Sequence, residues 1–142
     1  FWGSARGQWA RDNLDSTEQC SLGGATALRG YEQGTASGDL CQLYTAEFRY
    51  LTRLPGFTGG DYAVSLAAFY DLGRVQYRFD ASRQLPTFTQ MDKLASSGIS
   101  LNWDFNSDGL FQLVWAQDHG EVTDNPDPQQ VRRLSASLTV RF

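Results

Sequence analysis

Several features that mark common protein classes are scarce or missing in this sequence. It has a single histidine, His119, and no Cys or His lies near it in the chain. We therefore interpret His119 as a solvated side chain rather than a metal ligand, and we expect no metal and no cofactor. One histidine without an obvious acid–base partner also gives no Ser/His or Asp/His catalytic set, so we do not expect an enzyme.

Positive charge and long apolar runs are scarce as well. The net charge is −4, and only Arg132 and Arg133 are adjacent basic residues, so a nucleic-acid interface is not expected. No apolar run approaches the length of a transmembrane helix. The chain starts "FWGSARG", without Met or a charged leader, so we expect no signal peptide and a start within a longer protein.

What the sequence does contain is alternation with a period of two over most of its 142 residues, a length that suits one domain. Apolar and polar residues alternate in six segments, which we predict to be β-strands: 1–12, 41–51, 61–73, 94–105, 110–118 and 131–142. The connections at 55–60 and 106–109 have turn residues, whereas 13–39, 80–93 and 119–130 are long and polar. The pattern predicts long loops at one end of a sheet and short turns at the other.

Two architectures fit this alternation: a soluble β-sandwich or barrel, and a transmembrane β-barrel with its apolar face toward lipid. Three observations favour the membrane. The strands run to nine or more residues, and aromatic residues lie near their ends. The polar faces also carry charges in mid-strand (Glu47, Arg49 and Asp71). Six strands are too few for a closed membrane barrel, so we expect the remaining strands of the same barrel as a partner.

Three motifs then resemble the BamA/TpsB superfamily of outer-membrane proteins. "LSASLTVRF" resembles their final strand, in which the last aromatic residue, here Phe142, is recognised by the barrel-assembly machinery. Gly23-Gly24 followed by Leu28-Arg29-Gly30-Tyr31 resembles the V-R-G-[FY] motif of the sixth extracellular loop, with Leu28 in place of Val. "AAFYDLGRV" resembles the F-x-D-x-G strand motif through Phe69, Asp71 and Gly73. "RGYEQGTASGDL" is most similar to the TpsB branch, the transporters of two-partner secretion.

The resemblance implies an all-β fold: residues 1–142 as the last six of sixteen strands of an antiparallel barrel, with 13–39 as a loop folded into the lumen. In the family, the loop arginine, here Arg29, meets the strand aspartate, here Asp71. The POTRA domains, plug helix and first ten strands would lie outside this chain. The implied function is a Gram-negative outer-membrane pore for an unfolded TpsA-type exoprotein, an adhesin or haemolysin/cytolysin. With no nucleotide motif, export would be driven by the exoprotein folding outside.

Some alternatives stay open at this point. Glu47 and Arg49 are expected to line the lumen and balance neighbouring charge, and they are also candidates for the secretion path. Cys20 and Cys41 flank the loop and form either a disulfide or two buried thiols. A BamA- or TamA-like insertase shares both motifs. An outer-membrane enzyme and a soluble β-binding domain are the other function classes considered.

Overall fold

The structure, a computed structural model, describes residues 1–10, 14–55, 61–76, 91–105, 109–119 and 131–140. These residues form β-strands and turns without a helix, so the predicted all-β class is confirmed. In this part of the chain there is accordingly no helix long and apolar enough to cross a membrane. The strands are β1 (Trp2–Gln8), β2 (Cys20–Leu22), β3 (Ala36–Gly38), β4 (Leu40–Pro55), β5 (Asp61–Gln76), β6 (Met91–Asp104), β7 (Gly109–Asp118) and β8 (Arg132–Val140).

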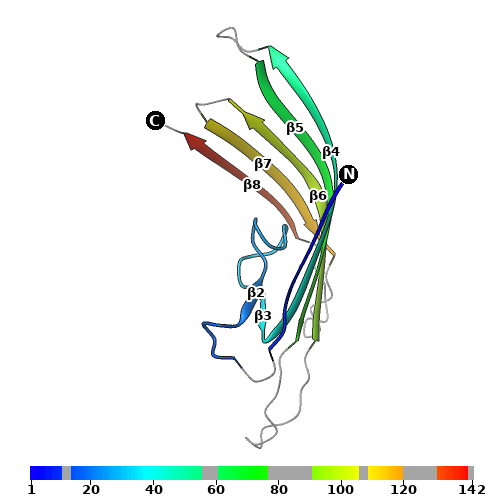
Figure 1. Cartoon of the computed structure of the whole chain (residues 1–142), viewed down its shortest axis with the longest axis vertical. Helices are drawn as coiled ribbons and strands as arrows, with labels where there is room; N and C mark the ends of the chain where they lie inside the picture. Colours follow the sequence, from blue (N-terminus) through cyan, green and yellow to red (C-terminus); the bar gives the residue numbers. More distant parts are fainter. Residues whose placement is uncertain (11–13, 56–60, 77–90, 106–108, 120–130, 141–142) are drawn as a thin grey trace, which may run out of the picture.

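Six of the strands form one antiparallel sheet in the order β1-β4-β5-β6-β7-β8. Figure 1 shows this sheet as a strongly curved wall, with β1 and β8 as its two edges. The sheet is not closed among the described residues. Its curvature, its antiparallel order and its unpaired edges are those of a section of a larger β-barrel, as the sequence predicts.

The central strands are long. β4 and β5 have 16 residues each and β6 has 14, whereas strands of soluble proteins usually have about five or six. At the edge, β1 has seven residues and is shorter than predicted, since it ends at Gln8. The strand ends joined by the short connections 56–60 and 106–108 lie at one end of the sheet, and those joined by the three long connections lie at the other end.

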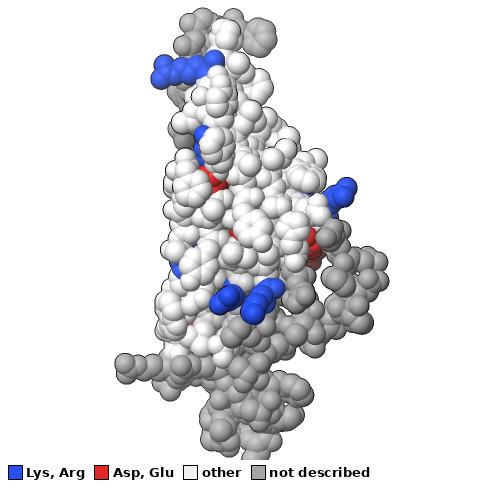
Figure 2. Space-filling view, turned by 90° about the vertical axis from the view of Figure 1, so that its right-hand side faces the viewer, with Lys and Arg blue, Asp and Glu red and all other residues white. Residues whose placement is uncertain are grey.

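The two faces of the sheet differ in chemistry. On the convex face the large side chains are apolar and exposed, and Figure 2 shows this face with few charged groups. On the concave face the strands carry Glu47, Asp71, Ser96 and Ser100, all of them buried. The exposed apolar residues of β4 to β8 on the convex side include Tyr44, Phe48, Tyr50, Leu66, Tyr70, Leu72, Ile99, Trp115, Leu134 and Leu138.

The folded-back segment, which the structure describes from residue 14 to residue 39, holds an element that the sequence analysis did not predict. It contains the hairpin β2–β3, in which Cys20 pairs with Gly38 and Leu22 pairs with Ala36. Strands of three residues are too short to show an alternating pattern. The hairpin is held instead by tertiary packing, because Leu22 and Ala36 belong to the buried cluster between this segment and the wall. Figure 1 shows the hairpin on the concave side of the sheet.

That cluster is the main apolar core of the described residues. Leu22, Leu28 and Tyr31 from the folded-back segment pack against wall residues, of which Val75 and Leu94 are almost fully buried. The wall makes room for them at one glycine. A Cβ at Gly73 would lie 2.7 Å from Leu22 Cδ1 and 3.3 Å from Leu28 Cδ1. The core therefore lies inside the curve of the sheet rather than within a sandwich.

Candidate functional site

The candidate site is the place where the folded-back segment touches the concave wall. Two glycines shape its tip: Gly24 has a φ of +93° and its N–H donates to the Tyr31 carbonyl at 3.0 Å. Gly30 also has a φ of +93°, and a Cβ there would lie 3.4 Å from the Cβ atoms of Ser96 and Ala116. A residue without a side chain thus lets the turn rest directly on β6 and β7, which directs the neighbouring Arg29 toward the wall.

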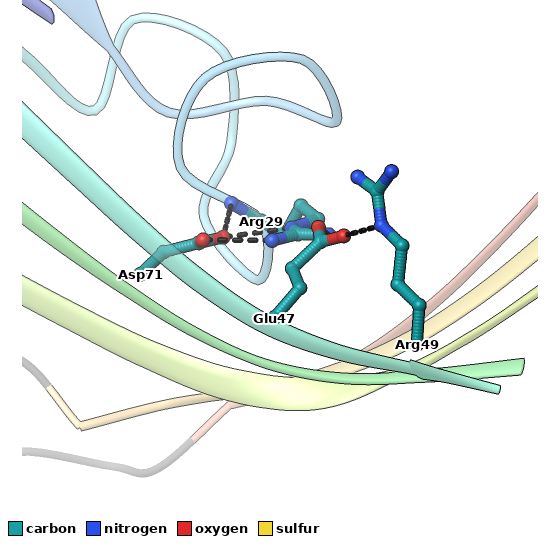
Figure 3. Close-up of polar contacts among 4 residues, drawn as sticks. All are labelled: Arg29, Glu47, Arg49 and Asp71. Atoms are coloured by element: carbon teal, nitrogen blue, oxygen red, sulfur yellow. Dashed lines mark hydrogen bonds and ion pairs between the residues drawn. The ribbon is translucent and has the colours of Figure 1, made fainter. Parts of the chain in front are cut away.

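Arg29 donates hydrogen bonds to the carboxylate of Asp71 in β5 from three of its nitrogen atoms. Its Nε donates to Asp71 Oδ2 at 2.7 Å, its Nη2 donates to Oδ1 at 2.7 Å, and its backbone N–H donates to Oδ2 at 3.4 Å. Figure 3 shows Arg29 reaching down from the loop onto this carboxylate. The paired side-chain contacts are the fork-like geometry in which an arginine binds a carboxylate most strongly.

Glu47 of β4 is a second partner for the same arginine. Arg29 Nη1 donates to Glu47 Oε1 at 2.6 Å, and Arg49 Nε donates to the other oxygen, Oε2, also at 2.6 Å. The guanidinium carbon of Arg29 lies 3.5 Å from the centroid of the Phe69 ring, in cation–π contact. Asp71, Arg29, Glu47 and Arg49 therefore form one alternating row of charges, visible in Figure 3 and called here the anchor.

Three of the four anchor side chains are largely removed from water, and the fourth, Arg49, is half-exposed. The side chain of Asp71 is 0% exposed, that of Glu47 8% and that of Arg29 13%. Burial by itself lowers the pKa of Arg29, but hydrogen bonds and charge attraction from Asp71 and Glu47 outweigh it and raise that pKa above its ordinary value. Two carboxylates and two guanidinium groups balance, so the row carries no net charge.

Strand register explains why one side chain reaches both carboxylates. Asp71 faces Thr45 and Glu47 faces Phe69, so the two acids are diagonal neighbours on adjacent strands. Diagonal positions on one face lie roughly 7–8 Å apart. A guanidinium placed between them spans that gap, and Phe69, on the same face, supplies the ring beneath it.

Other contacts fix the rest of the segment, and the sequence analysis did not predict them. Tyr31 Oη donates to the Ala95 carbonyl at 2.8 Å, and the exposed Glu32 pairs with Arg133 of β8 at 3.0 Å. Asp39, nearly fully buried, accepts from the Leu14 N–H at 3.0 Å. Tyr31, Glu32 and Asp39 all lie in the quoted "RGYEQGTASGDL" stretch, but of the three only Tyr31 was predicted as a site residue. The other contacts depend on the path of the loop, for which the sequence holds no local pattern.

Each predicted site residue inside the described ranges has a clear place. Leu28 and Tyr31 are in the apolar core, Gly30 rests on the wall, and Phe69 and Gly73 lie under the loop. Cys20 and Cys41 form a disulfide, with Cα atoms 6.4 Å apart, that ties β2 to β4. Phe142 lies outside the described residues. In the described part of the chain, no group of His, Cys, Asp and Glu side chains is arranged to hold a metal ion.

The arrangement holds a loop against the inner wall of a curved sheet through ion pairs and apolar packing. No covalent bond joins Arg29 to the wall, and an internal ion pair can exchange for water when the segment moves away. The disulfide, in contrast, fixes only the base of the segment, where β2 meets β4.

Comparison with known proteins gives a family and several relatives. The profile of a family described as "Haemolysin secretion/activation protein ShlB/FhaC/HecB" matches residues 1–103. The chain is 30% identical over 124 residues to the "Heme/hemopexin transporter protein HuxB" of Haemophilus influenzae strain 86-028NP, which covers 87% of this chain and 21% of that protein. It is 38% identical over 71 residues to the protein of the same name from strain ATCC 51907 / DSM 11121 / KW20 / Rd, covering 50% of this chain and 12% of that protein.

The chain thus spans about a fifth of the length of the first of these relatives. No solved structure matches it significantly. The match to the family profile includes the folded-back segment and both strands that hold the anchor, β4 and β5.

Proposed function

Because the chain belongs to the haemolysin secretion/activation family, the TpsB branch to which its motifs point, we propose that it is the C-terminal part of an outer-membrane pore. In this proposal the complete protein exports an unfolded exoprotein of the TpsA type, an adhesin or a haemolysin/cytolysin, from periplasm to cell surface. The chain has no catalytic role. Its partners are that exoprotein, the remaining strands of the barrel, outer-membrane lipid and the barrel-assembly machinery.

The convex face supports the placement in a membrane. The outward residues of β5 from Tyr62 to Leu72 are all apolar or aromatic. At about 3.3 Å per residue and a tilt near 40°, this stretch spans about 25 Å along the membrane normal, the height of the apolar band of such barrels. At the N-terminal end of this stretch, Tyr62 packs against Trp103 and Phe105, with ring centroids 6.4 and 5.7 Å away. Aromatic groups of this kind are typical of the membrane interface.

The single observation that carries the proposal is the anchor. A loop that lies on the lumen side of the wall occupies space through which an exported chain would have to pass. It is held there by a buried but non-covalent row of charges, with Asp71 at 0% exposure. We propose that this row sets the loop position needed for secretion, and that Glu47 and Arg49 act through it rather than as a separate path.

A gene deletion tests the proposed function. The full-length gene is removed from its native host, and mass spectrometry compares the culture supernatant, the cell surface and the outer membrane. The proposal expects one large secreted or surface protein to disappear from the outside while other outer-membrane barrels keep their levels. A general fall of outer-membrane barrels, with export intact, would instead identify an insertase of the BamA or TamA type.

A second candidate concerns the cargo and follows from the relatives. The proteins to which this chain is 30% and 38% identical are named heme/hemopexin transporters. We therefore propose heme/hemopexin transport as the alternative to an adhesin or cytolysin system. Growth of wild-type and deletion strains with heme–hemopexin as the iron source distinguishes the two: a defect confined to that source supports the heme/hemopexin role.

A further inference from the structure

Two cations lie side by side on the convex face. Arg74 of β5 and Lys93 of β6 are register partners, and both side chains are exposed. They point outward because the residues next to them, Gly73 and Leu94, face the inner core. Like charges directly opposite each other destabilise a sheet, and among the residues whose side chains the structure describes no carboxylate forms an ion pair with either cation. The pair therefore lacks a counter-ion within this part of the protein.

A groove surrounds these cations. It has a volume of about 530 Å³, and Arg74, Lys93 and His119 line it together with Tyr44 and Leu72. The ring of His119 is positioned by a 2.7 Å contact between its Nε2 and the Ser97 hydroxyl. The volume is in the range of small-molecule sites. The groove thus combines three nitrogen-bearing side chains, Arg74, Lys93 and His119, with two largely apolar ones, Tyr44 and Leu72. This combination suits a ligand that has an anionic end and an apolar end.

The groove lies where the apolar surface stops. Along β5 the outward residues Leu66, Ala68, Tyr70 and Leu72 are followed by Arg74, and β8 changes similarly from Leu134 to Arg132. Both changes occur at the end from which the long connections leave. Figure 2 shows two basic side chains next to each other in the lower part of this face, with further basic groups at its upper end and along its sides. In a membrane this level is the interface, where anionic headgroups meet basic side chains.

We propose that this groove binds the phosphate groups of an outer-leaflet lipid, a phosphorylated and multiply acylated glycolipid of the lipid A type. Arg74 and Lys93 hold the phosphates, and His119 offers a further hydrogen-bonding nitrogen at the groove wall. The acyl chains run along the convex face, where a second hollow of about 390 Å³ is lined by apolar residues such as Tyr50, Leu66 and Ile99. This apolar continuation is why a lipid fits better than a free phosphate. The inference rests on the proposed membrane orientation and not on the identity of the exoprotein.

The test uses the full-length transporter, purified in a neutral detergent. Native mass spectrometry compares binding of lipid A, of the same glycolipid without its phosphates, and of phosphatidylethanolamine. The wild type is expected to prefer lipid A. Charge-assisted hydrogen bonds are strong enough that Arg74→Gln with Lys93→Gln should weaken lipid A binding by at least about tenfold. Arg53→Gln is the matched control, because Arg53 lies toward the turn end of β4, far along the sheet from the groove, and it should bind like the wild type.

Several results would overturn the inference. They are equal binding of the phosphate-free glycolipid, unchanged affinity in the double variant, and a loss as large in Arg53→Gln. Displacement of lipid A by millimolar inorganic phosphate would assign the groove to a free anion instead. Arg74→Lys with Lys93→Arg keeps both charges and should retain binding, which separates charge from folding. Export is assayed in parallel, so that the two proposals are tested separately. If the wild-type transporter binds lipid A but exports no exoprotein, only the proposed function is contradicted.

Discussion

At the scale of single residues, Arg29 is the group on which the anchor depends, because it is the shared partner of two buried carboxylates. Removing one partner of a buried ion pair leaves an uncompensated charge and costs about 3–5 kcal/mol. We predict that Arg29→Ala releases the loop from the wall and strongly reduces export, while the barrel still inserts, since no lipid-facing residue changes. Export is measured by immunoblot of the exoprotein in the supernatant, and insertion by heat-modifiable migration in gels.

The conservative replacement sharpens this prediction. Arg29→Lys keeps the charge, but an ammonium is a point charge and cannot donate to Asp71 at two positions while also reaching Glu47. It should therefore restore little export. Normal export by Arg29→Ala, or full rescue by lysine, would mean that the fork geometry does not set the loop position.

The two acids should not be equivalent, which is a second prediction. Asp71 accepts three hydrogen bonds from Arg29, whereas Glu47 accepts one from Arg29 and one from the half-exposed Arg49. Asp71→Asn should thus reduce export more than Glu47→Gln. Combined with Arg29→Ala, either change should add little, because the interaction it removes is already lost. Strictly additive defects in this double-mutant cycle would show that the residues act separately.

The sequence could predict part of this site. Alternation placed Glu47, Asp71 and Phe69 on the inner face, and the motifs linked Arg29 to Asp71. The sequence could not show that Glu47 is a second partner of Arg29. That contact requires Glu47 and Asp71 to be diagonal neighbours, which depends on how β4 is aligned with β5. In the structure residue 42 pairs with residue 74 and residue 47 pairs with residue 69. The alternation fixes which face each residue takes, but the pairing of residues along that face also depends on the geometry of the turn between the strands.

At the scale of elements, Gly73 decides whether the folded-back segment fits onto β5. A Cβ there meets the ends of two flexible leucine side chains, Leu22 Cδ1 and Leu28 Cδ1. We therefore predict a mild effect for Gly73→Ala and displacement of the loop for Gly73→Leu. Limited proteolysis of the inserted protein should cut within residues 20–40 faster in the leucine variant. Gly3→Leu on β1, where a Cβ meets no atom closer than 3.6 Å, is the control and should not change the cleavage rate.

The disulfide supports the same segment at its base, which gives a fourth prediction. Cys20 and Cys41 are separated by 21 residues, and closing a loop of that size is worth about 3 kcal/mol in the chain-entropy model. Alkylation of the untreated protein should label no thiol from this chain, and reduction should expose two. Cys20→Ser with Cys41→Ser should still insert, but protease should cut the segment faster. Labelling of both thiols without reduction would exclude the bridge.

The elements that the sequence predicted best are those with the most residues. Long alternation identified the six strands of the main sheet. The hairpin β2–β3 was not predicted, because its two strands have only three residues each and show no alternating pattern. It depends instead on packing in the cluster that contains Val75 and Leu94. The end of β1 was predicted too late, since the alternating residues continue past Gln8 while the pairing with β4 stops there, opposite Cys41.

At the scale of the whole molecule, the two faces of the sheet require two different environments. The convex face exposes large apolar side chains such as Phe48 and Leu134, 67% and 70% exposed, which water would not stabilise. The concave face buries charges and a polar loop. A curved sheet with this distribution is stable where lipid covers the outside and the lumen contains the loop. The direction of the sheet across the membrane then follows from its connections.

The last prediction concerns that direction. The strand ends joined by the long connections, including 120–130, lie at one end of the sheet, and those joined by the short connections, including 106–108, lie at the other. Outer-membrane barrels have long extracellular loops and short periplasmic turns, so a cysteine at Asp124 should react with a membrane-impermeant maleimide on intact cells, and one at Ser107 should not. The native cysteines are bridged and give no background. Both sites should react after the outer membrane is permeabilised. Labelling of Ser107→Cys but not Asp124→Cys on intact cells would invert the sheet, and it would place Arg74 and Lys93 at the periplasmic interface instead of beside the outer-leaflet phosphates.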